Sequence, residues 1–117
     1  MSERDDRDQL DDIVGACEQI QWFLQGLDYA RFATDTRTIA AVERQLILIG
    51  EAVKGLSREV RDANPHVAWR EIAGMRDVIV HAYFRLSLPE VWDAATVGVP
   101  GLWEAAVSIR ADLQELP

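Results

Sequence analysis

The sequence predicts an all-α fold, an antiparallel bundle of four main helices with a short connecting helix between the second and the third. Hydrophobic residues make up 49% of the chain and recur at steps of three and four, which is the spacing of amphipathic helices. Only 7 glycines and 4 prolines occur among the 117 residues, so few positions break a helix. The loops between the predicted helices are short, which favours antiparallel neighbours in one domain spanning residues 1–117.

The first helix is predicted from about residue 6 to residue 26, where Gly26 is expected to end it. One apolar stripe marks its buried face: Leu10, Ile13, Val14, Cys17, Ile20, Leu24 and Leu27. Cys17 is the single cysteine of the chain, and its place on this stripe predicts a small core residue. Residues 28–33 are predicted to form a linker whose aromatic side chains hold it against the bundle.

The second helix is predicted to begin at one of three capping residues, Thr34, Asp35 or Thr36. Its apolar positions keep a coiled-coil-like spacing: Ile39, Val42, Leu46, Ile49, Val53 and Leu56. A second apolar stripe beside this one predicts a central position for the helix. Within it, Glu51 is expected to pair with Lys54 at the rim; the alternative places Glu51 near the polar motif described below.

A short helix is predicted over residues 58–63, between Ser57 as its cap and Pro65, which cannot continue it. The next helix is predicted from about residue 69 to residue 84, with Gly74 in its interior. Glycine costs roughly 1 kcal/mol relative to alanine at such a position. We therefore expect the backbone of another helix to approach Gly74 closely.

The last helix is predicted to begin after Ser87, because Ser87 and Glu90 have the spacing of a capping box. Its apolar stripe consists of Trp92, Ala95, Val99, Leu102, Ala106, Ile109 and Leu113. Pro100 and Gly101 interrupt this stripe. They are expected to kink the helix or to split it.

The predicted helix over residues 69–84 carries a polar motif of Arg76, Asp77, His81 and Tyr83. At about 100° per residue, Arg76 and Tyr83 point nearly the same way, and Asp77 and His81 are neighbours one turn apart. His81 lies about 140° from Arg76 on the helix, so the four side chains fan too widely to surround a substrate within one chain. Two copies facing each other across a dimer axis could do so, which predicts a homodimer.

The residue types of this motif suit phosphodiester cleavage. The guanidinium of Arg76 matches a phosphate, and His81 can move a proton near neutral pH. Asp77 is placed to orient the imidazole, while Tyr83 offers a hydroxyl and an aromatic face for a base. The spacing alone also fits a structural role, with a hydrogen-bonded histidine near a helix end and a solvated Arg–Asp pair.

Charge and composition limit the function classes. The net charge of −8 argues against a general nucleic-acid coat, because phosphate contacts dominate such binding. Residues 54–85, however, carry a net charge of +2 and both histidines, whereas residues 1–12 carry −4. The acidic flanks suit a basic protein partner, and the charged start of the chain, with no apolar run long enough for a membrane span, predicts a cytoplasmic protein.

No metal or cofactor is expected. The sequence contains no Gly-rich phosphate loop, no paired cysteines and no His/Glu pattern with metal-ligand spacing. Nuclease chemistry would therefore be metal-independent, with His81 as acid or base and Arg76 stabilising charge on the phosphate.

The segment Arg76, four residues, His81, one residue, Tyr83 resembles the signature of the HEPN superfamily, and in this fuller form that of its HepT branch. Further segments of the sequence are similar to the same branch: Ala41-Val42-Glu43-Arg44, Ile49-Gly50-Glu51-Ala52, Pro65 followed by Trp69 to Arg76, Val91-Trp92, and Val99-Pro100-Gly101-Leu102. The resemblance extends from about Leu10 to Leu113. Asp77 departs from the branch, which commonly carries asparagine there.

This resemblance implies a HEPN-like bundle that acts as a ribonuclease toxin of a type VII-like toxin–antitoxin pair, with Arg76 and His81 as catalytic residues. It further implies a homodimer, an RNA substrate and an MntA-like nucleotidyltransferase antitoxin that transfers AMP onto Tyr83. The alternative is a non-catalytic, nucleotidyltransferase-associated module. In that case Arg76 and His81 would bind a nucleotide or another substrate without cleaving RNA.

Overall fold

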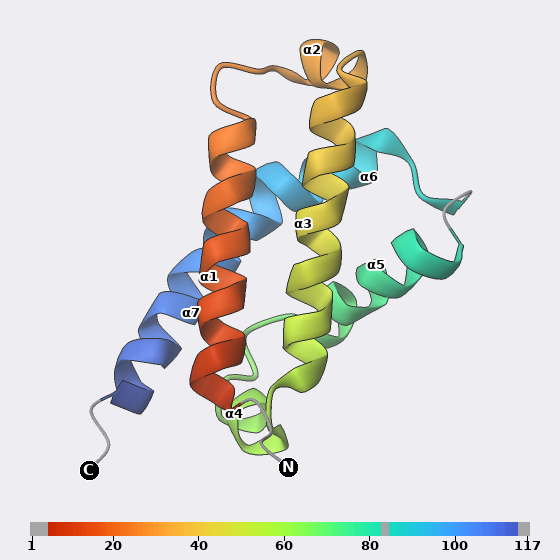
Figure 1. The fold of residues 1–117 in the computed structure, drawn as a ribbon. Helices are drawn as coiled ribbons and strands as arrows, with labels where there is room; N and C mark the ends of the chain where they lie inside the picture. Colours follow the sequence, from red (N-terminus) through yellow and green to blue (C-terminus); the bar gives the residue numbers. More distant parts are fainter. Residues whose placement is uncertain (1–4, 83–84, 115–117) are drawn as a thin grey trace.

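The computed structural model describes residues 5–82 and 85–114, and every regular element within them is helical (Figure 1). The elements in chain order are α1 (Asp6–Phe23), α2 (Tyr29–Ala33), α3 (Thr36–Gly55), α4 (Arg58–Ala63), α5 (Trp69–His81), α6 (Leu88–Asp93), the π-helix η2 (Ala94–Gly98) and α7 (Val99–Gln114). The prediction of an all-α fold is therefore confirmed. None of the described helices is both long and apolar enough to cross a membrane.

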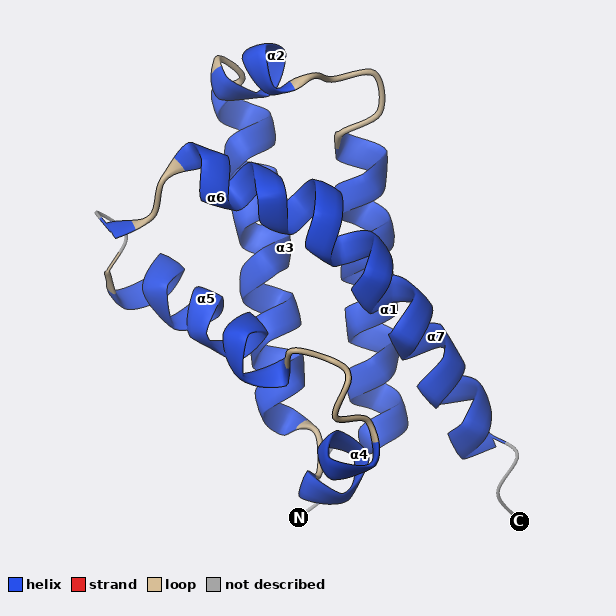
Figure 2. Cartoon of the chain, turned by 180° about the vertical axis from the view of Figure 1, so that it is seen from behind, coloured by secondary structure: helices blue, strands red, loops and turns tan. Residues whose placement is uncertain are grey.

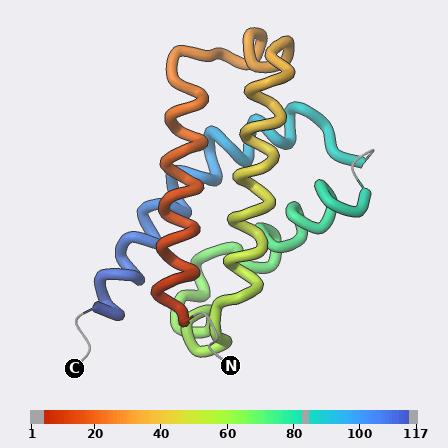
Figure 3. The backbone as a smooth tube through the Cα atoms, in the orientation of Figure 1, coloured from red at the N-terminus to blue at the C-terminus, as the bar shows by residue number. Residues whose placement is uncertain are grey.

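Two of the four main helices, α1 and α3, form an antiparallel pair and lie side by side (Figures 1 and 2). α7 packs on α1, and α5 packs on α3. The central position predicted for α3 is thus shared with α1. Figure 3 shows that α5 crosses α3 obliquely, so that the carboxyl end of α5 diverges from the pair. This crossing positions the polar motif.

The predicted apolar stripes of α1 and α3 form much of the core. Their fully or nearly fully buried members are Leu10, Ile13, Val14, Cys17, Ile20, Val42, Leu46, Ile49, Val53 and Leu56. Cys17 is completely buried, and this desolvation, together with the nearby Glu18, raises the pKa of its thiol to about 12. Cys17 is therefore a core residue, as predicted.

Side-chain caps begin most of the helices, because the first backbone N–H groups of a helix have no partner within it. Asp5, Asp28, Asp35, Ser57 and Ser87 each accept a hydrogen bond from the backbone N–H three residues later. The predicted caps at Ser57 and Ser87 are confirmed, and Asp35 is the cap among the three candidates for α3. Asp6 also accepts two bonds of 2.7 Å from Ser57, which tie the start of α1 to the α3–α4 turn.

Residues 28–33, predicted as a linker, contain the short helix α2. The side chain of Asp28 accepts from Arg31 N at 2.9 Å and begins the helix. Phe32 is completely buried and lies 5.1 Å from Trp92 between ring centroids, while Tyr29 meets Trp92 edge-on at 6.0 Å. The expectation that aromatics hold this segment to the bundle is confirmed, although its conformation was predicted wrongly.

Two helix ends also differ from the prediction. α1 ends at Phe23, three residues before the expected stop, and Gly26 adopts a positive φ of 76° in the turn that follows. The last helix is interrupted near Pro100, as expected, but the interruption is the π-helix η2, which ends at Gly98, two residues before the proline. Proline lacks the N–H that would continue the regular ladder, and the hydroxyl of Thr96 donates to the carbonyl of Trp92 at 2.7 Å within this wider turn.

Candidate active site at the crossing of α3 and α5

α3 and α5 meet closely at Gly50 and Arg76. A Cβ added to Gly50 would lie 2.1 Å from the Cβ of Arg76, a distance that two carbon atoms not bonded to each other do not tolerate. The absence of a side chain at Gly50 therefore allows Arg76 to enter between the two helices, where its side chain is only 20% exposed. The close approach predicted at Gly74 is wrong, because a Cβ there would meet nothing within 4 Å.

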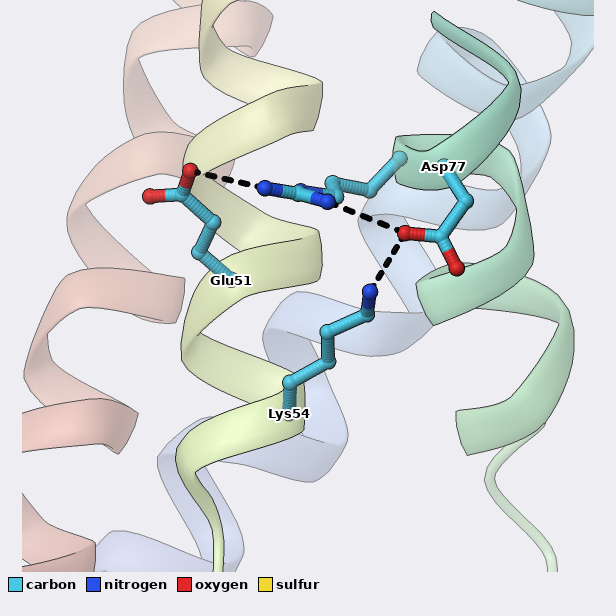
Figure 4. A network of polar contacts seen from close by, with 4 residues as sticks. Glu51, Lys54 and Asp77 are labelled. Carbon is cyan, nitrogen blue, oxygen red and sulfur yellow. Dashed lines mark hydrogen bonds and ion pairs between the residues drawn. The ribbon is translucent and has the colours of Figure 1, made fainter. Parts of the chain in front are cut away.

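The guanidinium of Arg76 is held by two carboxylates. Its Nη1 donates to Oδ1 of Asp77 at 3.0 Å, and its Nη2 donates to Oε1 of Glu51 at 3.4 Å. Lys54 Nζ donates to the same Oδ1 atom of Asp77 (Figure 4). Glu51 therefore faces the motif, and its predicted pairing with Lys54 is wrong because the crossing of α5 places Arg76 and Asp77 between them.

These contacts favour the charged forms of both motif residues. Hydrogen bonds from Lys54 and then Arg76 hold the pKa of Asp77 below its usual value of 3.8. The hydrogen bond to Asp77, followed by that to Glu51, raises the pKa of Arg76. The cluster thus contains two cations and two carboxylates at neutral pH, and its net charge is zero.

The Nε–H of Arg76 is a further feature of this arrangement. The nitrogen is buried and has no hydrogen-bond acceptor among the described residues. Buried donors are nearly always paired. The resting contacts of Arg76 therefore leave one strong donor of the guanidinium unused.

His81 is the last residue of α5 and is exposed. It lies one turn beyond Asp77 on the same face of the helix. The predicted role of Asp77 in orienting the imidazole is not supported, because the carboxylate bonds to Arg76 and Lys54, and no hydrogen bond joins it to His81 in the described part of the chain. The structural alternative for His81 is equally unsupported, because its side chain makes no hydrogen bond within residues 5–82 and 85–114.

The structure thus brings Arg76 and Asp77 together and leaves His81 separate. Tyr83 and the predicted end of the motif helix near Phe84 lie outside the described residues. Sequence reasoning named Gly50 and Lys54 but did not assign them to the site. Their signal was present, because Gly50, Glu51 and Lys54 recur at helical spacing on one face of α3.

The surface around α5 has two concave regions of different character. An apolar cavity of about 410 Å³ lies on the side facing α7 and is lined by Ile72 and Met75 of α5, together with Leu46, Val99 and Leu102. A polar groove of about 890 Å³ lies on the side that carries Gly74 and Asp77. The motif residue Asp77 lines the polar groove, so the apolar cavity is not where the motif's chemistry is placed. Within the described residues, no group of three or more His, Cys, Asp or Glu side chains is arranged to hold a metal ion.

The sequence is similar over nearly its whole length to proteins named as ribonucleases. The protein named "Putative RNase MJ0125" from Methanocaldococcus jannaschii is 36% identical over 115 residues, which cover 98% of this chain and 99% of that protein. "Probable ribonuclease HepT" from Thermococcus cleftensis is 36% identical over 99 residues, 85% of this chain and 90% of that protein. No solved structure matches the chain significantly.

The profile of the family described as "Ribonuclease HepT-like" matches residues 13–109. The matched region includes the whole crossing of α3 and α5, with Gly50, Glu51, Arg76 and His81. The resemblance predicted from the motif is therefore confirmed, as is the prediction of an enzyme at the level of the family. The chain belongs to the family of HepT-like ribonucleases.

Proposed function

We propose that this protein is an endoribonuclease toxin that cleaves RNA without a metal ion, with Arg76 and His81 as its catalytic residues. The observation that carries the proposal is the placement of Arg76. A guanidinium is held at a helix crossing that requires glycine on the opposite helix, and an exposed histidine stands five residues further along α5. These two groups supply the charge stabilisation and the proton transfer that phosphodiester cleavage needs.

In this mechanism Arg76 binds the phosphate that is cleaved and stabilises the negative charge that builds up on its oxygens. His81 takes the proton of the attacking ribose hydroxyl or gives a proton to the oxygen that leaves. The unused Nε–H of Arg76 supports a bound state in which the guanidinium changes partners. A phosphate would replace the carboxylates of Asp77 and Glu51 that it contacts at rest.

The working unit is proposed to be a homodimer. Arg76 points between α3 and α5, whereas His81 lies at the exposed end of α5, so one chain does not gather both groups around a phosphate. Two α5 helices facing each other across a two-fold axis would place Arg76 and His81 of both chains in one cleft. Light scattering at micromolar concentration tests this, and a monomer there would count against it.

The proposed antagonist is an MntA-like nucleotidyltransferase that acts in the same cytoplasm and transfers AMP onto Tyr83. Tyr83 stands two residues after His81 in the sequence. An anionic adduct at this position would compete with RNA for Arg76 and repel the phosphate backbone. This modification would silence the site without unfolding the protein.

The decisive experiment compares wild type with Arg76→Ala and His81→Ala in cells and in vitro. Wild type is expected to be toxic on overexpression and to cleave RNA in excess EDTA, and each variant is expected to lose both properties by orders of magnitude while its far-UV circular dichroism stays helical. Loss of cleavage with EDTA would contradict the metal-independent mechanism. Cleavage that survives both substitutions would show that the site lies elsewhere.

One observation favours the alternative of a non-catalytic nucleotide-binding module: among the described residues, none forms a hydrogen bond that would orient the His81 imidazole for proton transfer, and Asp77 bonds to Lys54 and Arg76 instead. A harmless wild type that binds nucleotides, and that loses this binding in Arg76→Ala, would support the module. Toxicity that His81→Ala abolishes would support the enzyme.

A further inference from the structure

The polar groove beside the motif lies where the end of α3, the helix α4 and the first half of α5 meet. Its volume is about 890 Å³, near the upper end of the range for small-molecule sites, which is roughly 300–1,000 Å³. The cationic side chains on its walls come from all three helices: Lys54, Arg58, Arg61 and Arg70. We refer to it as the α4 groove.

The charges of the α4 groove are unevenly satisfied. Its carboxylates are Asp62, Glu71 and Asp77, and Asp77 already bonds to Lys54 and Arg76. In contrast, no carboxylate of the described residues lies within 4.0 Å of the guanidinium groups of Arg58, Arg61 or Arg70. Among the described residues, the groove therefore has three arginines and two carboxylates that form no ion pair. This local excess of positive charge occurs in a protein whose net charge is −8.

The groove leads toward the proposed catalytic histidine. Arg70, Gly74, Asp77 and His81 follow one face of α5, within about 60° of one another on an ideal helix and over about 16 Å of its length. The first three of these residues line the groove. A Cβ at Gly74 would meet nothing within 4 Å, so the middle of this face is open. An elongated anion can therefore lie along α5 from Arg70 toward His81.

We propose that the α4 groove binds the phosphate backbone of the RNA substrate next to the phosphate that is cleaved, with Arg58 and Arg70 as binding residues. This inference rests on the proposed function. Cations spread along an open groove match a chain of phosphates better than a single small anion, for which they would have to converge. Arg58 and Arg70 are exposed, so both are available to a ligand.

RNA binding is tested on the His81→Ala protein, because this variant should leave the RNA intact. The affinity for a fluorescent single-stranded RNA is measured by fluorescence anisotropy at several salt concentrations. In this background the double change Arg58→Gln and Arg70→Gln is expected to weaken binding at least tenfold at low salt. The slope of log affinity against log salt is expected to fall by about 1.4, because each phosphate contact with a single strand contributes about 0.7. Arg61 is left unchanged, because its Nε is buried and its loss would test folding as well.

The matched control is the double change Arg31→Gln and Arg37→Gln. These arginines are also exposed and have no ion pair among the described residues, but they belong to α2 and the start of α3. The control removes the same two charges and is expected to leave the affinity within about twofold. Equal affinities of the two double variants would overturn the proposal. If the groove variant then failed to bind the purified nucleotidyltransferase, the groove would instead be a protein-docking surface.

A second pair of variants tests the same groove without removing arginine. Gly74→Glu places a carboxylate in its open middle, whereas Gly15→Glu places one on the exposed side of α1, where a Cβ also meets nothing within 4 Å. Both replace a helical glycine, so both raise helix propensity. We expect Gly74→Glu alone to weaken RNA binding; equal binding by both would contradict the proposal.

Failure of this proposal and failure of the proposed function can be told apart. Cleavage of RNA by wild-type protein is measured separately from binding. If wild type cleaves no RNA but the groove variants lose binding, the catalytic proposal is wrong and the groove is supported. If wild type cleaves RNA and the groove variants bind like their controls, only the groove proposal is wrong.

Discussion

The Nη1 atom of Arg76 lies 3.0 Å from Oδ1 of Asp77, and Lys54 donates to that same oxygen. Two cations thus converge on one carboxylate oxygen of their own chain, in the way that they would converge on an oxygen of a phosphate. In the proposed mechanism, Asp77 would therefore compete with a substrate phosphate for these two cations. The residue type at position 77 should determine how readily Arg76 and Lys54 exchange this carboxylate for a phosphate.

The first prediction concerns Asp77→Asn. The amide oxygen can still accept a hydrogen bond, but it carries no full charge, so Arg76 and Lys54 are held less tightly. We expect several-fold tighter RNA binding, measured by anisotropy in the His81→Ala background, and cleavage at least equal to wild type when His81 is restored. A large loss of cleavage would show instead that the charge of Asp77 is needed to position Arg76 or His81.

The second prediction concerns the pH dependence of stability. The pKa of Asp77 is lower in the folded protein than its usual value of 3.8, so its ion pairs stabilise the folded state when the carboxylate is ionised. This contribution is fully present above pH 4 and is lost as the pH falls through the lowered pKa. Urea unfolding of wild type and Asp77→Asn should therefore differ at neutral pH and converge in strong acid. If the difference in the free energy of unfolding persisted unchanged in strong acid, it would arise from packing and not from the charge of Asp77.

The third prediction compares the glycine at the crossing, Gly50, with a helical glycine of α5 that faces open space, Gly74. Gly50→Ala would place a Cβ 2.1 Å from Arg76 Cβ, and because that atom is fixed to the backbone, α3 and α5 must move apart. We expect a loss of about 1–3 kcal/mol in the free energy of unfolding, together with a strong loss of cleavage. Gly74→Ala is the control: its Cβ meets open space, and the variant should gain up to about 1 kcal/mol from helix propensity. Equal stabilities of the two variants in urea would contradict this account.

The fourth prediction concerns Tyr83→Phe. A phenol titrates near 10 and is a poor base at neutral pH, so Phe at this position should retain much of the toxicity. It removes the hydroxyl that would accept AMP, so the variant should escape neutralisation by the nucleotidyltransferase. Mass spectrometry after co-expression should show AMP-sized additions on wild type and none on the Phe variant. Neutralised wild type without an adduct would mean that silencing occurs by complex formation.

The long helices could be predicted because their signals are local and redundant. The stripes of α1 and α3, the caps at Ser57 and Ser87 and the interruption near Pro100 all arise from neighbours in the sequence. α2 could not be predicted in this way. Five residues are too short to form a helix by propensity alone, and this one depends on aromatic packing against Trp92, 60 residues after Phe32.

The site likewise has features that local sequence signals predict and features that depend on the packing of distant segments. The presence of Arg76, Asp77 and His81 on one helix was readable from the motif, and so was the angular separation of Arg76 from His81. The partner of Glu51 could not be read from the sequence. The choice between Lys54 on its own helix and Arg76 on another depends on how α5 crosses α3. The position of closest approach was misassigned for a related reason. Both Gly50 and Gly74 are helical glycines, and only the crossing distinguishes which one faces a neighbour.

Gly50 and Arg76 lie 26 residues apart in the sequence. Because they are in contact, the residues that evolution can accept at one position depend on the residue at the other. In a protein with this helix crossing, a side chain larger than hydrogen at the first position and an arginine at the second cannot coexist without separating the helices. A descendant that acquired the side chain first would lose the placement of the arginine, even though its Arg-x4-His motif remained intact in the sequence. Inspection of the motif alone would then count such a protein as active, whereas the replacement of the upstream glycine would predict that it is not.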